Sequence, residues 1–195
     1  MEKKYKNTYR IDSARLRCWD YGWNGAYFVT ICTNKRICYF GRVACGEMNL
    51  SNIGKIANEC WWDIPKHFPF VILDAFVVMP NHVHGIIIIN KSNDGKNLVL
   101  ETQNLASLKQ QSKNPGIPVN KFGAQSKNLA SIIRGYKIGV TKQARIQIRE
   151  FGWQPRYYDH IIRDEISYSR MRQYISTNPR RWREDCFNGI IQSEP

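Results

Sequence analysis

Two histidines separated by one residue, His82 and His84, are the residues of this sequence best suited to chemistry. The apolar run over positions 82–89 predicts a β-strand, in which alternate side chains share one face. Both imidazoles then project together, at a spacing that allows them to bind one metal ion. Two imidazoles leave such an ion short of ligands, which other protein groups, water or substrate oxygens must supply. The alternative is a pair of strand histidines held by ordinary hydrogen bonds.

A tyrosine and an asparagine four residues apart, Tyr174 and Asn178, form a second candidate pair. On a helix they lie on one face, about one turn apart. A tyrosine hydroxyl can attack a phosphate, and an amide oxygen can ligate a metal ion beside it. The alternative is a core tyrosine followed by an asparagine that ends the helix before Pro179. Tyr168 is a second tyrosine on this helix, but its neighbour four residues on is Arg172, which suits a phosphate clamp.

The histidines need a strand to position them, and the pattern around them predicts a hairpin. Apolar runs over 70–78 and 82–89 flank Met79-Pro80-Asn81, so an antiparallel pair is the simplest interpretation. Within the second run Val83, Ile87 and Ile89 would face the core, opposite the histidines.

Earlier in the chain, the β-branched and aromatic run over 27–33 predicts a strand, with which residues 38–40 could pair. Ser51 is a candidate N-cap for a helix whose apolar residues recur at helical spacing until Pro65 stops it. Residues 90–126 are polar and predict a loop or insertion.

The C-terminal part predicts an amphipathic helix, a strand over 153–162 that contains His160, and a helix from an Asp164 cap to Asn178. Leu129, Ile132, Ile133, Tyr136 and Val140 form the apolar stripe of the first of these helices. The element order is βαββαβ followed by a helix that carries the tyrosine. This order predicts an α+β fold, a ferredoxin-like sandwich with a mainly antiparallel sheet. We expect a basic N-terminal segment over 1–26 and one domain over 27–195.

The chain is strongly basic, with a formal net charge of +13 and a pI near 9.6. Such an excess favours a polyanionic partner. Residues 43–89, which contain the histidine pair, carry a net charge of −2, whereas 1–42, 90–126 and 127–195 carry +6, +3 and +6. The candidate phosphate contacts are basic residues of the amphipathic helix and of the segment after Pro179: Lys127, Arg134, Lys137, Lys142, Arg145, Arg180, Arg181 and Arg183.

The six cysteines have irregular spacing and form no Cys-x-x-Cys pair, so we expect reduced thiols, mostly buried. The charged N-terminus is not followed by the apolar region of a signal peptide, and no apolar run reaches membrane-spanning length. We therefore expect a cytoplasmic protein with no membrane partner.

Two motifs in this order resemble a known family. Pro80-Asn81-His82-Val83-His84 resembles the histidine-hydrophobe-histidine signature of single-tyrosine HUH transposases. The pattern Tyr174-Ile175-x-x-Asn178-Pro179, with the segment 153–163 upstream of it, resembles the REP-associated tyrosine transposase branch. The resemblance extends from about residue 27 to residue 182.

The resemblance implies a nuclease and strand transferase that cuts single-stranded DNA beside a hairpin, as a monomer or homodimer. It implies that His82 and His84 bind Mg²⁺ or Mn²⁺, which polarises the scissile phosphate. Asn178 falls where related insertion-sequence transposases carry a glutamine as third ligand. Tyr174 would form a 5′-phosphotyrosine and release a 3′-hydroxyl.

Two other functions stay open from the sequence. A non-cleaving relative could hold DNA or RNA hairpins through its basic face. A metal-dependent RNA nuclease could use the histidines without Tyr174. His160 could be a third imidazole near the metal, or a hydrogen-bonded structural residue.

Overall fold

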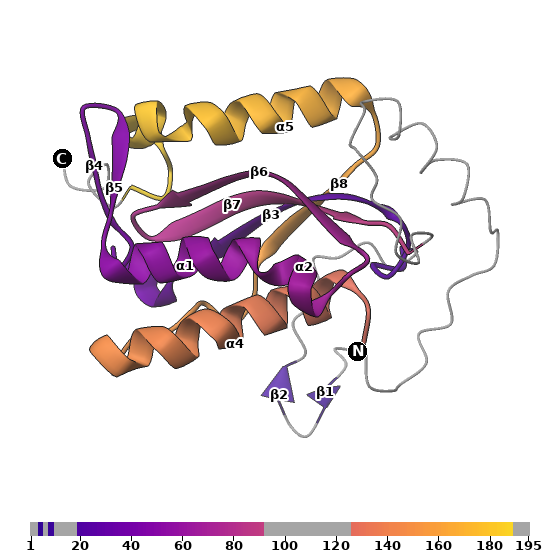
Figure 1. Ribbon diagram of the computed structural model, residues 1–195, viewed down its shortest axis with the longest axis horizontal. Helices are drawn as coiled ribbons and strands as arrows, with labels where there is room; N and C mark the ends of the chain where they lie inside the picture. The colour runs from indigo at the N-terminus through magenta and orange to yellow at the C-terminus, as the bar shows by residue number, and fades with distance from the viewer. Residues whose placement is uncertain (1–3, 6–7, 10–18, 92–125, 189–195) are drawn as a thin grey trace.

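The computed structural model describes residues 4–5, 8–9, 19–91 and 126–188 (Figure 1). Its centre is an antiparallel sheet with the strand order β6-β7-β3-β8. These strands are β3 (Gly25–Cys32), β6 (Val71–Met79), β7 (His82–Ile89) and β8 (Tyr158–Ile162). Two separate ribbons pair β1 (Lys4–Tyr5) with β2 (Thr8–Tyr9), and β4 (Gly41–Ala44) with β5 (Glu47–Leu50).

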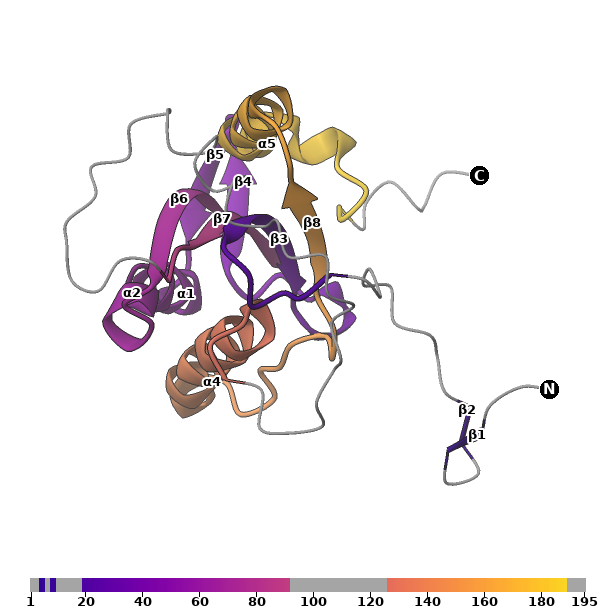
Figure 2. The ribbon, with the colours of Figure 1, turned by 90° about the vertical axis from the view of Figure 1, so that its right-hand side faces the viewer.

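Helices cover both faces of the sheet (Figures 1 and 2). One face carries α1 (Asn52–Trp62), the short α2 (Ile64–His67) and α4 (Leu129–Gln147). The other face carries α5 (Glu165–Thr177), which continues into the 3₁₀ helix η2 (Asn178–Glu184). The βαββαβ order, the strand arrangement and the added C-terminal helix confirm the ferredoxin-like α+β prediction.

The alternation of side chains along β7 divides the interior into two clusters. Val83, Ile87 and Ile89 pack with α1 and α4 in the larger cluster, as predicted. Ile86 and Ile88 pack under α5 in the smaller cluster. Since strand side chains alternate, this register places His82 and His84 on the α5 face.

The helices begin where capping side chains predict. Ser51 Oγ accepts a hydrogen bond from the backbone N–H of Gly54 (3.0 Å), and Asp164 Oδ1 accepts one from Ser167 (2.7 Å). The first helix ends before Pro65, which lies in the first turn of α2, where a missing N–H breaks no helical hydrogen bond.

Residues 38–40 were expected to form a strand, and this prediction is wrong. The 3₁₀ helix η1 (Asn34–Arg36) follows β3, and the second ribbon forms later, between β4 and β5. Cys45 and Gly46 join these two strands with positive φ angles of 53° and 76°, the conformation of a two-residue hairpin turn.

The strand expected over 153–162 is shorter than predicted. Only Tyr158–Ile162 pairs with β3, and Trp153 makes a single bridge to Thr33. Pro155 lies between the two paired regions, where it cannot donate to a ladder.

Several expectations concern residues with little or no description. The predicted N-terminal segment 1–26 and the polar insertion 90–126 lie largely outside the described residues. Of the five described cysteines, none forms a disulfide and only Cys32 is buried, so the expectation of mostly buried thiols is wrong. None of the described helices is both long and apolar enough to cross a membrane.

Candidate metal and tyrosine site

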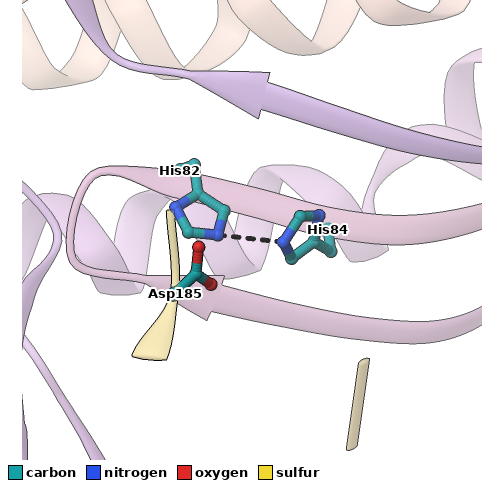
Figure 3. Close-up of side chains that lie close together, drawn as sticks. All are labelled: His82, His84 and Asp185. Carbon is teal, nitrogen blue, oxygen red and sulfur yellow. Dashed lines mark hydrogen bonds between the residues drawn. The ribbon is translucent and has the colours of Figure 1, made fainter. Parts of the chain in front are cut away.

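His82 and His84 point to the same side of β7, and their Nε2 atoms lie 2.9 Å apart (Figure 3). Their residues are 0% and 1% exposed. The buried pair begins at the turn of the β6–β7 hairpin, where the backbone N–H groups of Thr33 and Phe40 bond to the carbonyls of Asn81 and Pro80. The turn is therefore held on both residues, which fixes the start of β7.

Asn81 determines which nitrogen of His82 carries the proton. Its amide nitrogen donates to the carbonyl oxygens of Arg36 (3.1 Å) and Phe187 (2.8 Å). The amide oxygen is thus left facing His82 Nδ1 at 2.8 Å, and an oxygen of this kind can only accept. Nδ1 of His82 therefore holds the proton, and its Nε2 presents a lone pair toward His84.

Thr30 is the partner of His84, with Oγ1 at 2.8 Å from Nδ1. A hydroxyl can donate or accept, so it suits either tautomer of this ring. When His84 Nε2 donates to His82, Nδ1 accepts from Thr30. When Nε2 is a metal ligand, Nδ1 carries the proton and donates to the same oxygen.

Both imidazoles are neutral at physiological pH. Burial lowers the pKa of His84 to about 3. Burial also lowers the pKa of His82 well below its usual value, and the nearby charges of His84 and Arg36 lower it further. A neutral imidazole is the form that binds metal ions.

The sequence did not point to Asp185, which the structure brings to the histidines (Figure 3). One ligand atom from each of His82, His84 and Asp185 lies within 4.8 Å of the others. Asp185 follows η2, whose Trp182 ring centroid is 6.0 Å from that of His82. The Phe187 ring, at 4.6 Å from the His82 ring, covers the pair. No local motif marks this carboxylate, because only the path of the chain after α5 places it here.

The donor set fits a divalent cation. Ligands at about 2.1 Å from an octahedral ion lie about 3 Å apart when they are adjacent. The two Nε2 atoms, now joined by a 2.9 Å hydrogen bond, are close enough together to become adjacent ligands of one ion. Two imidazoles and a carboxylate are ligands for Mn²⁺, Fe²⁺ or Zn²⁺ as well as Mg²⁺.

Tyr174 extends from α5 to the histidine pair, with its hydroxyl 3.4 Å from His84 Nε2. Its ring meets Phe28 edge to face at 6.0 Å. Burial raises the pKa of Tyr174, the charge of Asp185 raises it further, and the amide of Asn178 lowers it. The structure therefore brings together the tyrosine and the histidines, 90 residues apart in the chain.

Asn178 ends α5 and is buried, at 2% exposure. Its Oδ1 atom has no hydrogen-bond partner among the described residues. A buried amide oxygen without a partner is costly, and a ligand would satisfy it. This orphan acceptor is compatible with the predicted ligand role.

Tyr168 and His160 do not join the site in this structure. Tyr168 is 6% exposed, and its hydroxyl donates to Asp74 Oδ2 at 2.7 Å. His160 lies opposite Phe28 in the β3–β8 register and is not in the group of His82, His84 and Asp185.

The predicted phosphate contacts fall into two groups on opposite sides of the sheet (Figure 2). Arg180, Arg181 and Arg183 lie on η2, on the α5 side of the sheet, and are exposed. The other group lies on α4 or just before it, on the opposite face from α5: Lys127, Arg134, Lys137, Lys142 and Arg145.

In this group Nε of Arg145 already donates to the carbonyl oxygen of Phe151 (3.0 Å), and the ammonium of Lys137 is bonded too. It donates to the carbonyl oxygens of Gln154 (2.7 Å) and Arg156 (3.0 Å). Burial lowers the pKa of Lys137 to about 8. Lys137 therefore holds the segment before β8, and it is less available to DNA than Arg134 or Lys142.

Comparison with known proteins supports the fold. No family model matches this chain. A solved structure of a REP-associated tyrosine transposase bound to a REP hairpin has a TM-score of 0.54 and 19% sequence identity. The match covers 87% of this chain and 73% of that one. At this identity the likeness establishes a shared fold.

One relative is close in sequence. An uncharacterized protein of Haemophilus influenzae (strain ATCC 51907 / DSM 11121 / KW20 / Rd) is 41% identical over 175 residues. The match covers 89% of this chain and 90% of that protein. The chain therefore belongs to the same family as this Haemophilus influenzae protein, and it has the fold of a REP-associated tyrosine transposase.

Proposed function

We propose that this protein is a metal-dependent endonuclease and strand transferase, a transposase that cuts single-stranded DNA beside hairpins. The observation that best supports this proposal is that the Tyr174 hydroxyl lies 3.4 Å from Nε2 of His84, which belongs to a buried pair of neutral imidazoles. A nucleophile beside two candidate metal ligands suits metal-assisted transfer of a phosphoryl group to the protein. The shared fold with a REP-associated tyrosine transposase supports the same reaction.

His82, His84 and Asp185 would hold the divalent ion, and Asn178 could add its unpartnered amide oxygen. When bound, Mg²⁺ or Mn²⁺ supplies positive charge that polarises the scissile phosphate and opposes the raised pKa of Tyr174. Two imidazole ligands favour Mn²⁺ over Mg²⁺ in affinity. Asn81 leaves the Nε2 lone pair of His82 free, and Thr30 can accept a hydrogen bond from Nδ1 of His84, so both Nε2 atoms would be available as ligands.

In the proposed reaction the phenolic oxygen of Tyr174 attacks the phosphorus and loses its proton. A bond forms between that oxygen and the 5′-phosphate, and the bond from phosphorus to the 3′-oxygen breaks. The leaving 3′-oxygen takes up a proton and becomes a hydroxyl. One phosphoester replaces another, so rejoining needs no ATP.

Hairpin DNA is the substrate we propose, by analogy with the hairpin named for the structural neighbour. Arg180, Arg181 and Arg183 are the phosphate contacts we place nearest the chemistry, because they lie on η2 with Trp182, whose ring centroid is 6.0 Å from that of His82. The α4 group lies across the sheet (Figure 2), so DNA must pass an edge of the sheet to reach both groups.

The test is a covalent adduct. Labelled single-stranded DNA with a hairpin is incubated with the protein and Mn²⁺, then resolved on a denaturing gel. We expect an adduct with wild type and with Tyr158→Phe, the same change at an exposed tyrosine, and none with Tyr174→Phe. An adduct that persists in Tyr174→Phe would remove this residue as nucleophile.

A second candidate, a hairpin-binding protein that does not cut, is favoured by one observation. Phe187 covers the histidines, both of which are closed to solvent. DNA can reach these buried atoms only if side chains packed on them, such as Phe187, move. Tight hairpin binding by wild type without an adduct or cleavage would support this candidate. Mn²⁺-dependent RNA cleavage that survives Tyr174→Phe would instead support a nuclease without a covalent step.

A further inference from the structure

Strand β6 contains an irregularity beside a carboxylate that faces the tyrosine helix. Its register with β7 shifts between Leu73 and Phe76. Those two residues pack in the cluster under α1 and α4, whereas Ala75 packs under α5. Asp74 also faces α5, since it bonds to that helix. Two consecutive side chains on one face are the result of a β-bulge, which re-aims a residue.

Asp74 holds two residues of α5 that lie one turn apart. Its Oδ2 accepts from the Tyr168 hydroxyl at 2.7 Å and lies 3.2 Å from Nε of Arg172. The Arg172 guanidinium also lies 5.9 Å from the centre of the Tyr168 ring. The side chain of Asp74 is 13% exposed and Tyr168 is 6% exposed, so the bond between them is shielded from water, whereas the Arg172 side chain is 54% exposed.

The remaining contacts between α5 and the sheet are largely apolar. Met171 and Ile175 pack on the smaller cluster with Ile86 and Ile88. Apolar contact is not directional and permits a helix to rotate or slide. Hydrogen bonds to a carboxylate are directional, so Asp74 fixes the rotation and position of α5 that the apolar contacts leave free.

The rotation of α5 matters because the Tyr174 hydroxyl lies far from the helix axis, so a small rotation displaces it strongly. A tyrosine hydroxyl lies about 9 Å from the axis of its helix, so a rotation of about 10° moves it by about 1.5 Å. A displacement of about 1 Å from the attack geometry can cost about 100-fold in rate. Holding α5 is therefore part of aiming the hydroxyl toward His84.

We propose that Asp74 is a positioning residue for Tyr174, acting through Tyr168 and Arg172. This inference rests on the proposed cleavage reaction. It assigns a role to Tyr168, the second tyrosine of this helix, and to Arg172, which the sequence suggested as a phosphate clamp. In this role both act on the helix and neither needs to touch DNA.

The experiment is single-turnover adduct formation with saturating hairpin DNA and Mn²⁺. For Asp74→Ala we expect the rate constant to fall about 30-fold to 100-fold. Hairpin Kd should change less than twofold, and the final amount of adduct should equal that of wild type. Asp74→Asn keeps an acceptor for the Tyr168 hydroxyl, so it should recover part of the rate.

The matched control is Asp63→Ala, which removes a carboxylate paired with Lys66 at 2.6 Å, on the far face of the sheet. Its rate constant should equal that of wild type. Unfolding of Asp74→Ala would lower the amount of adduct and leave the rate constant unchanged, and that result would overturn the proposal. An equal rate loss in Asp63→Ala would overturn it too.

Hydrogen exchange of the free protein gives a readout that needs no activity. Amides of α5 should exchange at least tenfold faster in Asp74→Ala, while those of α4 stay as in wild type. Unchanged exchange in α5 would refute the proposed positioning role of Asp74. If wild type forms no adduct, the proposed function is refuted instead. Hydrogen exchange alone would then decide whether Asp74 holds α5.

Discussion

The two faces of the central sheet differ in composition and in the role that we assign to each. The face under α1 and α4 is a continuous apolar cluster that includes Val83, Ile87 and Ile89 of β7. The face under α5 has a smaller apolar cluster and then, toward the β6–β7 turn, His82 and His84. Burial of apolar surface stabilises the domain on one side, which allows the other side to hold buried polar groups.

Polar groups of the α5 face are stable there because they are paired. Thr30 and Asn81 each bond to a histidine, and Asp74 bonds to α5. Asn178 Oδ1 is the exception that a ligand would satisfy. Changes on this face should therefore affect chemistry first, whereas changes on the α1 and α4 face should affect stability first.

The largest effect should come from removing the histidine pair. The double variant His82→Ala and His84→Ala should lose Mn²⁺ binding and cleave at least about 1,000-fold more slowly, because several kcal/mol of charge stabilisation is lost. Hairpin binding should persist. Calorimetry with Mn²⁺, cleavage assays and gel shifts measure the three properties.

The control for this variant is His160→Ala, which removes a half-buried imidazole from the same face. It should retain Mn²⁺ binding. Loss of hairpin binding in the double variant would show that the pair serves folding or recognition, and the contrast between the faces would fail.

The next effect concerns Ile87 on the opposite face, which is fully buried. Ile87→Ala should lower the free energy of unfolding by about 2–5 kcal/mol, because it removes apolar contacts and leaves a cavity. The cleavage rate constant of the folded fraction should not change. Urea denaturation measures the loss, and Ile146→Ala, at an 84% exposed isoleucine, should change stability by less than about 0.5 kcal/mol. A reduced rate constant in Ile87→Ala would mean that the two faces are coupled.

A smaller loss should follow Gly85→Ala. A Cβ at this position would lie 2.6 Å from Cη2 of Trp61 and 3.1 Å from Cδ2 of Phe76. Rings in the stacked Trp61–Phe76 pair must then shift, at a cost of about 1–3 kcal/mol. Thermal unfolding would show the loss. Stability equal to that of wild type would mean that the Trp61 and Phe76 rings can accommodate the added methyl group without cost.

The smallest effect should be a pH dependence from Lys137. Its pKa of about 8 in the folded protein lies below the usual 10.5. Between these values the unfolded chain binds more protons, so stability should rise with pH from about 8 to 10.5. The partly exposed side chain limits the gain to the order of 1 kcal/mol.

Lys137→Met should remove that rise, which urea denaturation at pH 7.5 and 10 would show. An identical rise in both proteins would assign it to other groups. The salt dependence of hairpin binding gives a second comparison, because Arg134→Ala should flatten the slope more than Lys137→Ala does.

The sequence by itself determined the local features of the site. Strand alternation set His82 and His84 on one face and Val83 on the other, and the helical spacing placed Tyr174 and Asn178 one turn apart. The caps at Ser51 and Asp164 marked two helix starts. These features depend on neighbours within a few residues, so periodicity was enough to predict them.

Only the tertiary structure decided how distant segments meet. Asp185 reaches the histidines because η2 folds back from α5, and Asp74 reaches Tyr168 because α5 packs on the face of β6 that carries this carboxylate. The basic residues of the amphipathic helix and those after Pro179 lie far from one another, since α4 and α5 cover opposite faces of one sheet. Contacts between remote segments depend on chain path and packing, which no local pattern encodes.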